Sequence, residues 1–84
     1  MKEKSKLERL NIETRVSAIL QELFDRDTIE YDDNFFDMGG TSLAALKLIL
    51  EVESSFGIDS LTPEQLYRAP TLNGIVEAIE INVR

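Results

Sequence analysis

Two residue types that supply much of protein chemistry are missing from this chain of 84 residues. Without cysteine, disulfides, thiolate metal sites and nucleophilic thiols are excluded. Without histidine, the commonest general base and zinc ligand are excluded as well. The chain therefore brings no obvious catalyst, and we do not expect an enzyme. Its length predicts one small domain over residues 1–84, with a core of about 7–82.

Positive charge is also scarce, since nine Lys and Arg stand against sixteen Asp and Glu, for a net charge of -7. Nucleic-acid binding depends on clustered Lys and Arg, so we expect no nucleic-acid partner, and a basic protein partner fits better. No apolar run is long enough to span a bilayer, and the start, MKEKSKLERL, lacks the apolar core of a secretory signal. We expect a cytoplasmic monomer with no membrane partner.

Apolar residues recur at helical spacing in three segments, and a fourth, short segment has the end signals of a helix. The three stripes are Ile12, Val16, Ile19, Leu20 and Leu23; Leu43, Leu46, Ile49, Leu50, Val52 and Phe56; and Leu72, Ile75, Val76, Ile79 and Val83. Thr62, Pro63 and Gln65 predict the start of the short helix, and Pro70 its end. The predicted fold class is all-α, a small four-helix bundle with three longer helices and one short helix.

Several helix ends can be predicted from capping residues. The first helix begins after either Ser5 or Asn11, since both are good N-caps. The second helix ends at Gly57, with Ile58 expected to make the apolar contact that accompanies such a cap. Gly74 lies inside the last helix, where it costs about 1 kcal/mol against alanine, so close packing is expected there.

A long loop separates the first and second helices, because residues 25–41 show no sustained period and mix Asp, Asn, Gly and aromatic residues. A loop of this length in so small a domain is usually functional. Four residues are expected to anchor it to the core: Ile29, Tyr31, Phe35 and Phe36.

The carboxylates of this loop raise two chemical possibilities, a metal site and an acid/base pair. A calcium loop starting at Asp25 would need an oxygen ligand at Ile29, a glycine at position 30 and a glutamate at position 36, and all three are absent. Paired carboxylates need a substrate cleft, for which so small a bundle has little room. The candidates for such a pair are Asp32, Asp33 and Asp37. A solvated acidic loop is the better interpretation.

The stretch MGGTSL at the end of the loop is, taken alone, a flexible turn followed by an N-cap. Ser42 lies at the helix start, where unpaired N–H groups and the helix dipole favour an anion. Gly39 and Gly40 would let another molecule approach without a Cβ clash. A phosphate ester on the Ser42 hydroxyl would therefore be well placed.

Three motifs carry a family resemblance over most of the chain: DDNFFDMGGTSL, then FG, then LYRAPTL. In this order and spacing they resemble the peptidyl carrier (thiolation) domains of nonribosomal peptide synthetases, within the acyl-carrier-like superfamily. Their typical pattern is an acidic residue, NFF, two residues, GG, any residue and SL, followed later by LF, two residues and PT. This chain has Tyr67 in place of the Phe and Met38 in place of a frequent Leu.

The resemblance implies that a phosphopantetheinyl transferase moves 4'-phosphopantetheine from coenzyme A onto the Ser42 hydroxyl. The thiol of the arm would then hold an aminoacyl, peptidyl or acyl group as a thioester, which explains how a carrier can lack cysteine. The implied further partners are an adenylation enzyme and condensation, tailoring or thioesterase enzymes. The residues implied in flanking recognition are Gly39, Gly40, Thr41 and Leu43.

Two other functions remain open from the sequence. Fatty-acid-type acyl carriers usually have an Asp before the modified serine, so Gly-Gly-Thr favours the peptidyl type over an acyl carrier of polyketide or fatty-acid type. A noncovalent helical docking module with an unmodified Ser42 is the second alternative. The initial Met is compatible with a free-standing carrier as well as with an excised domain.

Partner contacts are expected on two helices. On the second helix they would involve Leu43, Lys47, Glu51 and Glu53, although a charged helix face is solvated by default. On the short helix, either Leu66 or Tyr67 must pack inward while the other stays available to partners.

Overall fold

The computed structural model describes the backbone of residues 2–84 and the side chains of residues 7–84. Within this part of the chain there are four helices: α1 (Lys2–Phe24), α2 (Ser42–Phe56), α3 (Pro63–Arg68) and α4 (Leu72–Asn82). The only strand-like pairing in the described chain is an isolated antiparallel bridge between Asn34 and Thr71. The predicted all-α fold, with a long loop over residues 25–41, is therefore confirmed.

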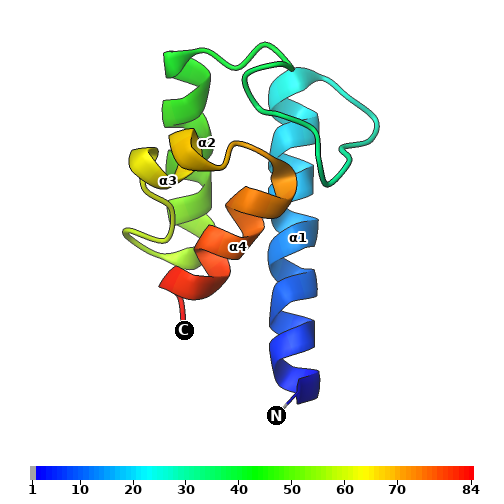
Figure 1. Cartoon of the computed structure of the whole chain (residues 1–84), viewed down its shortest axis with the longest axis vertical. Helices are drawn as coiled ribbons and strands as arrows, with labels where there is room; N and C mark the ends of the chain where they lie inside the picture. Colours follow the sequence, from blue (N-terminus) through cyan, green and yellow to red (C-terminus); the bar gives the residue numbers. More distant parts are fainter. Residues whose placement is uncertain (1) are drawn as a thin grey trace.

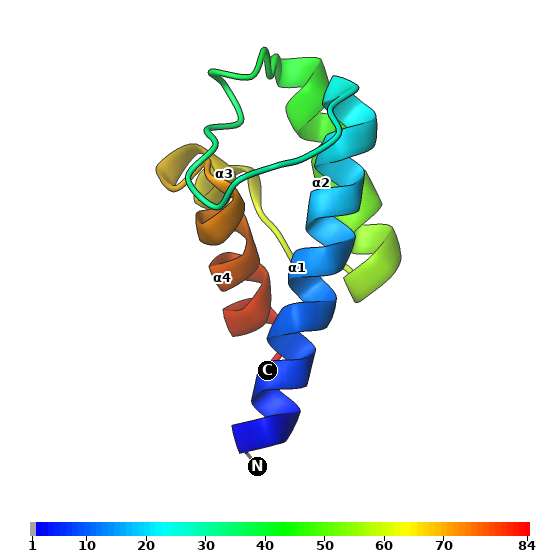
Figure 2. The same ribbon diagram turned by 90° about the vertical axis from the view of Figure 1, so that its right-hand side faces the viewer.

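The helices pack so that α1 contacts both α4 and α2, while the short α3 contacts α2 and α4. In both views the loop between α1 and α2 lies at one end of the bundle, opposite the first turns of α1 (Figures 1 and 2). The start of α2 lies at this same end. The segment MGGTSL thus sits where the loop returns to the bundle.

One cluster of buried side chains joins all four helices and the loop. Its members are Ile12, Val16, Ile19, Leu20, Ile29, Phe35, Ala45, Leu48, Ile49, Val52, Leu61, Leu66, Leu72, Ile75, Val76 and Ile79. The stripes predicted for the first and last helices are confirmed, except that Leu23 is half-buried and Val83 is exposed. Burying these side chains is the main favourable contribution to folding.

The prediction for the buried face of α2 is wrong in three places. Leu43, Leu46 and Leu50 are 62%, 53% and 56% exposed. The buried residues of this helix are instead Ala45, Leu48, Ile49 and Val52. The apolar arc of α2 is wider than the surface that its neighbours cover, because the helices that pack on it, α1 and α3, leave part of the arc uncovered. An apolar strip on α2 therefore faces solvent.

The helix starts are set by threonines in three of the four cases. Helix α1 already begins at Lys2, so Ser5 and Asn11 lie inside it and neither is its cap. The predicted capping box of α3 is confirmed, since the Thr62 hydroxyl accepts from the Gln65 amide and the Gln65 side chain accepts from the Thr62 amide. Thr71 caps α4 in the same way by accepting from the amide of residue 74.

Gly57 ends α2 as predicted, with a φ of 108° and its N–H donated to the Glu53 carbonyl at 2.8 Å. The apolar contact expected from Ile58 is not made, because this side chain is 88% exposed. The chain turns inward two residues later instead. Ser60 is buried and its hydroxyl donates to the Gly57 carbonyl at 2.7 Å.

Three of the four predicted loop anchors pack on the core. Ile29 and Phe35 are buried, and Phe36 is partly buried against the cluster. Tyr31 is not an anchor of this kind, since it is 56% exposed. Its hydroxyl instead donates to a Glu13 carboxylate oxygen at 2.9 Å, which holds the middle of the loop to α1.

The close packing expected at Gly74 is present, and it predicts that Gly74→Ala destabilises the protein. An added Cβ would lie 2.5 Å from the Ala69 carbonyl oxygen and 2.7 Å from the Ala69 Cβ. Overpacking costs of about 1–3 kcal/mol should outweigh the gain of about 1 kcal/mol in helix propensity. Urea denaturation should therefore show a lower midpoint, whereas the exposed Glu77→Ala in the same helix should stay within about 0.5 kcal/mol of wild type. An unchanged midpoint for Gly74→Ala would contradict this packing.

The amide protons of the loop over residues 25–41 should exchange at different rates. The Phe35 amide donates to the Pro70 carbonyl at 2.7 Å, and the side chain of Phe35 itself is fully buried. We expect this amide to exchange slowly, whereas the other loop amides should exchange faster than those of Leu48 and Ile49 in α2. Hydrogen exchange followed by NMR measures this directly. Uniform protection across the loop and α2 would show that the loop is as stable as the helix.

Candidate functional site

The end of the loop is a tight turn organised by Asn34. Its side-chain oxygen accepts from the amides of Phe36 and Asp37 at 2.9 and 3.1 Å. Its carbonyl accepts from the Met38 amide at 3.0 Å. Asparagine side chains commonly stabilise turns in this manner, so the NFF motif carried a signal for this role that the sequence interpretation did not use.

The two glycines after this turn are needed for different reasons. Gly39 has a φ of 105°, which side-chain-bearing residues rarely adopt, and an added Cβ there would meet nothing within 4 Å. At Gly40 an added Cβ would lie 2.3 Å from a ring carbon of Phe35 and 2.6 Å from its carbonyl oxygen. Gly39 thus leaves open space as expected, whereas Gly40 allows the backbone to lie directly on the Phe35 ring.

Two adjacent hydroxyls, those of Thr41 and Ser42, follow the glycines. Thr41 is the N-cap of α2, and its hydroxyl oxygen accepts from the Ala44 amide at 3.1 Å. Ser42 is the first residue of the helix, is exposed, and its hydroxyl makes no hydrogen bond to the described residues. The cap of α2 is therefore Thr41, the first of the two hydroxyl residues. The Ser42 hydroxyl is left available to solvent.

The surroundings of Ser42 on α2 are apolar. Leu43 follows it directly, and Leu46 and Leu50 extend the exposed strip along the helix. In the turn, Phe36 and Met38 pack partly against the core. The exposed hydroxyl thus lies at one end of a largely uncharged surface.

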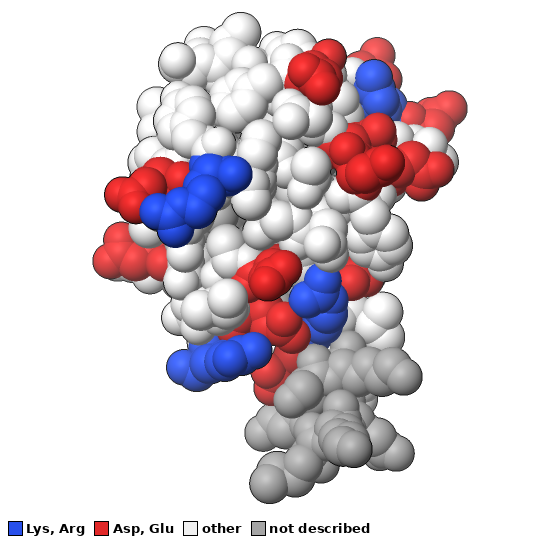
Figure 3. All heavy atoms as spheres, in the orientation of Figure 1, with Lys and Arg blue, Asp and Glu red and all other residues white. Residues whose placement is uncertain are grey.

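The loop carboxylates gather at the same end of the molecule, as the acidic side chains over the loop show (Figure 3). Among residues 7–84, no group of three or more potential ligands is close enough to hold a metal ion. Asp33 is used locally, since its carboxylate accepts from the Glu30 amide at 2.8 Å and lies 3.9 Å from the Arg26 guanidinium. Asp33 therefore already has partners within the loop.

The pKa of Tyr31 departs from its usual value. The hydrogen bond to Glu13 and the negative charge of that carboxylate raise the pKa of the phenol. Arg9 binds the same Glu13 carboxylate at 3.2 Å and also contacts Glu80 at 3.0 Å. A raised pKa means that the phenol remains the donor of this hydrogen bond to a higher pH, and the bond is a structural contact between the loop and α1.

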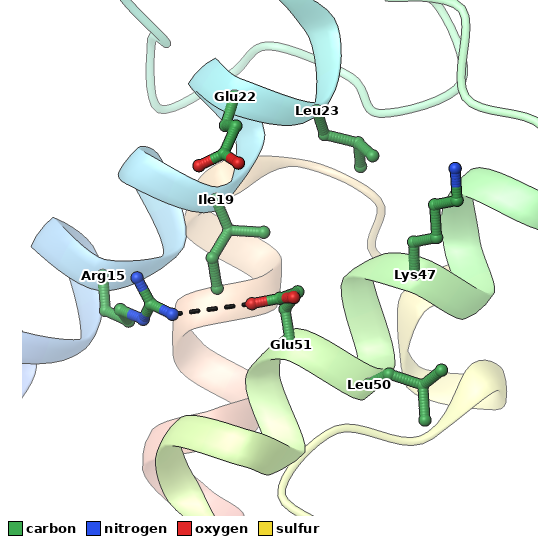
Figure 4. A pocket seen from close by; sticks show the side chains of 7 residues that line it. All are labelled: Arg15, Ile19, Glu22, Leu23, Lys47, Leu50 and Glu51. Atoms are coloured by element: carbon green, nitrogen blue, oxygen red, sulfur yellow. Dashed lines mark ion pairs between the residues drawn. The ribbon is translucent and has the colours of Figure 1, made fainter.

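A groove of about 530 Å³ lies between α1 and α2 (Figure 4), and Ser42 is not one of the residues that line it. Its lining residues are Arg15, Ile19, Glu22, Leu23, Lys47, Leu50 and Glu51. Within it, Arg15 pairs with Glu51 at 3.6 Å and donates to the Ser55 hydroxyl at 2.8 Å. Glu53 on the same helix accepts from the Asp59 amide at 2.9 Å. Both glutamates expected to meet a partner therefore already have contacts within the chain.

Within the described chain, no helix combines the length and the apolar character that crossing a membrane requires.

The short helix α3 presents its two candidate residues differently, as the sequence required. Leu66 is fully buried, whereas Tyr67 is 54% exposed.

The sequence of this chain matches a known protein family. The phosphopantetheine attachment site family matches residues 14–79. Phosphinothricin tripeptide synthetase PhsC of Streptomyces viridochromogenes is 37% identical over 68 residues, which are 81% of this chain and 6% of that protein. The chain thus spans only a small part of the curated relatives that it matches.

Two solved structures share the fold. BlmI, a type-II acyl-carrier protein from Streptomyces verticillus involved in bleomycin biosynthesis, superposes with a TM-score of 0.87 at 24% identity, covering all of both chains. A prototype peptidyl carrier domain of modular peptide synthetases superposes with a TM-score of 0.70 at 25% identity, covering 81% of this chain and 88% of that one. The predicted resemblance and carrier fold are confirmed: this chain belongs to the phosphopantetheine attachment site family and is similar to the peptidyl carrier domains of nonribosomal peptide synthetases.

Proposed function

We propose that Ser42 is the attachment residue for 4'-phosphopantetheine and that the chain carries aminoacyl or peptidyl thioesters between the enzymes of a nonribosomal peptide or related pathway. The observation that carries this proposal is the exposed Ser42 hydroxyl at the start of α2, which makes no hydrogen bond to the described residues. Membership of the phosphopantetheine attachment site family supplies the cofactor. The absence of cysteine is then no obstacle, because the arm supplies the thiol.

The neighbouring hydroxyl, that of Thr41, is less suited to modification than that of Ser42. The Thr41 oxygen accepts from the Ala44 amide, and using it as a nucleophile would break the cap of α2. Ser42 can be esterified without losing any contact of this kind. In the reaction its oxygen forms the new bond to phosphorus, the pyrophosphate bond of coenzyme A breaks, and adenosine 3',5'-bisphosphate leaves.

The position of Ser42 also suits the charge of the product. A phosphodiester on this oxygen would carry a negative charge beside the free N–H groups of the first turn of α2, a helix of 15 residues. Gly39, Gly40, Thr41 and Leu43 would form the flanking surface for recognition. Of these, Gly39 supports access through its open space, and Leu43 through its exposed side chain.

The partners follow from this role. We infer a phosphopantetheinyl transferase that installs the arm, an adenylation enzyme that loads it, and condensation, tailoring or thioesterase enzymes that use the cargo. We also infer that residues 1–84 act as one carrier domain without catalytic activity of its own, in the cytoplasm and as a monomer. The single core cluster formed by all four helices supports one domain.

Variants of Ser42 and Thr41 should distinguish the loss of modification from the loss of stability. Incubation to completion with coenzyme A and a broad-specificity phosphopantetheinyl transferase should add one phosphopantetheine to wild type and, at a rate that reflects the altered flanking surface, to Thr41→Val, but none to Ser42→Ala, as read by intact-protein mass. Thr41→Val should lose about 1 kcal/mol of stability with the N-cap, whereas Ser42→Ala should stay within about 0.5 kcal/mol. If folded wild-type protein that bears no arm gained no mass, the noncovalent docking module would be the better explanation.

Loading distinguishes the peptidyl from the acyl type. We expect the modified protein to accept an aminoacyl group from a nonribosomal adenylation enzyme, because Gly-Gly-Thr rather than Asp precedes Ser42. A malonyl-type unit from an acyltransferase should load at a much lower rate. Parallel assays with one enzyme of each kind, followed by mass spectrometry, measure both. The reverse order would assign the chain to polyketide or fatty-acid carriers.

A further inference from the structure

We propose that Tyr67 is a positioning residue for the modification of Ser42, acting through the ring of Phe36 on the glycine turn before α2. This inference rests on the proposed function of Ser42. Tyr67 belongs to α3 and is 54% exposed, so filling the core does not explain its ring. Leu66 beside it already supplies the buried contact of this short helix.

The ring of Tyr67 stacks on that of Phe36. The two ring centroids are 5.3 Å apart and the planes differ by only 6°. Phe36 in turn meets Phe35 edge to face, at 5.1 Å and 89°. Both arrangements are favourable for aromatic pairs, so a continuous row of rings runs from the exposed side of α3 to the buried Phe35.

The same two phenylalanines hold the glycine turn through their backbone. The Phe36 carbonyl accepts from the Gly39 amide at 3.1 Å, and the Phe35 carbonyl accepts from the Gly40 amide at 3.0 Å. Gly40 also lies directly on the Phe35 ring. The carbonyls that accept from the Gly39 and Gly40 amides thus belong to the two residues whose rings are packed. Holding these rings in place therefore restrains both acceptors.

A second tie joins α3 to this turn. The Phe35 amide donates to the carbonyl of Pro70, which follows α3 closely in the chain. Helix α3 has six residues, too few to be stable by itself, so its place depends on such contacts. The stack and this hydrogen bond make α3 and the turn one unit, which ends at Thr41 and Ser42.

Breaking the stack should loosen the turn and lower the fraction of carrier that presents Ser42 correctly. In the unmodified carrier alone, Tyr67→Leu and Phe36→Leu should each speed amide exchange of Gly39 and Gly40 about three- to tenfold. With the transferase and coenzyme A, KM for the carrier should rise by at most the same factor while kcat stays unchanged, because KM follows the competent fraction whereas exchange follows the open fraction. Tyr67→Phe keeps the ring and should restore both readouts.

Tyr31→Leu is the matched control, since Tyr31 is a tyrosine of similar exposure, 56%, that contacts α1 instead of the turn. It should leave the Gly39 and Gly40 amides and the KM of modification within twofold of wild type. Urea denaturation of every variant confirms that the assays use folded protein.

The double variant Phe36→Leu, Tyr67→Leu decides whether Tyr67 acts through Phe36. If it does, the double variant should be no worse than the more affected single variant. Independent effects that multiply would mean that Tyr67 contacts the transferase directly, and would overturn the proposal. Unchanged glycine exchange in both single variants would also overturn it. If wild type itself gained no arm, the proposed function would fail, whereas the exchange of the glycine amides would still report on the stack.

Discussion

The burial of Phe35 is the constraint on which the rest of this structure depends. Its side chain is fully buried, and the ring meets Phe24 at the end of α1 edge to face at 5.2 Å. Its amide binds the Pro70 carbonyl and its carbonyl binds the Gly40 amide, so the backbone is held on both sides. A long polar loop is therefore pinned at one residue to α1, to the segment after α3 and to the turn before α2. Removing this ring would leave a cavity and remove its contacts with the Phe24 ring and with Gly40.

The small residues just before α2 have different structural roles. Gly39 provides a backbone conformation, Gly40 provides room for the Phe35 ring, and Thr41 provides the helix cap. Ser42 has none of these structural duties in the described chain. A side chain without a structural role can be modified without cost to the fold, whereas its neighbours are constrained by packing and hydrogen bonding.

Charge is distributed so that most described arginines are already paired. Arg9, Arg15, Arg26 and Arg68 each lie within 4 Å of a carboxylate on the same chain. The exposed pairs among these contribute little to stability, and acidic side chains gather over the loop at the end of the bundle where α2 also begins (Figure 3). A partner that approaches this end meets negative charge from the loop and apolar side chains from α2. Complementary partners should therefore combine basic and apolar groups at their contact surface.

Local patterns in the sequence were sufficient for the helices, for most of their caps and for the candidate hydroxyl. The capping box of Thr62 and Gln65 and the cap at Thr71 depend only on neighbours within one turn, so they can be predicted without the fold. The stripes of α1 and α4 were also clear, because both helices contribute one face to a shared core.

Tertiary packing alone decided which apolar residues stay outside and which distant side chains meet. The period of α2 could not exclude Leu43, Leu46 and Leu50 from the core, because their exposure depends on how much of the helix its neighbours cover. Phe36 and Tyr67 are far apart in the chain, and their stacking follows only from the place of α3. The sequence by itself determined the helices and the start of α2, because the spacing of apolar residues and caps within one turn specify them. The surface around the Ser42 hydroxyl was decided only by the fold, because it is built from contacts between segments that no local pattern relates.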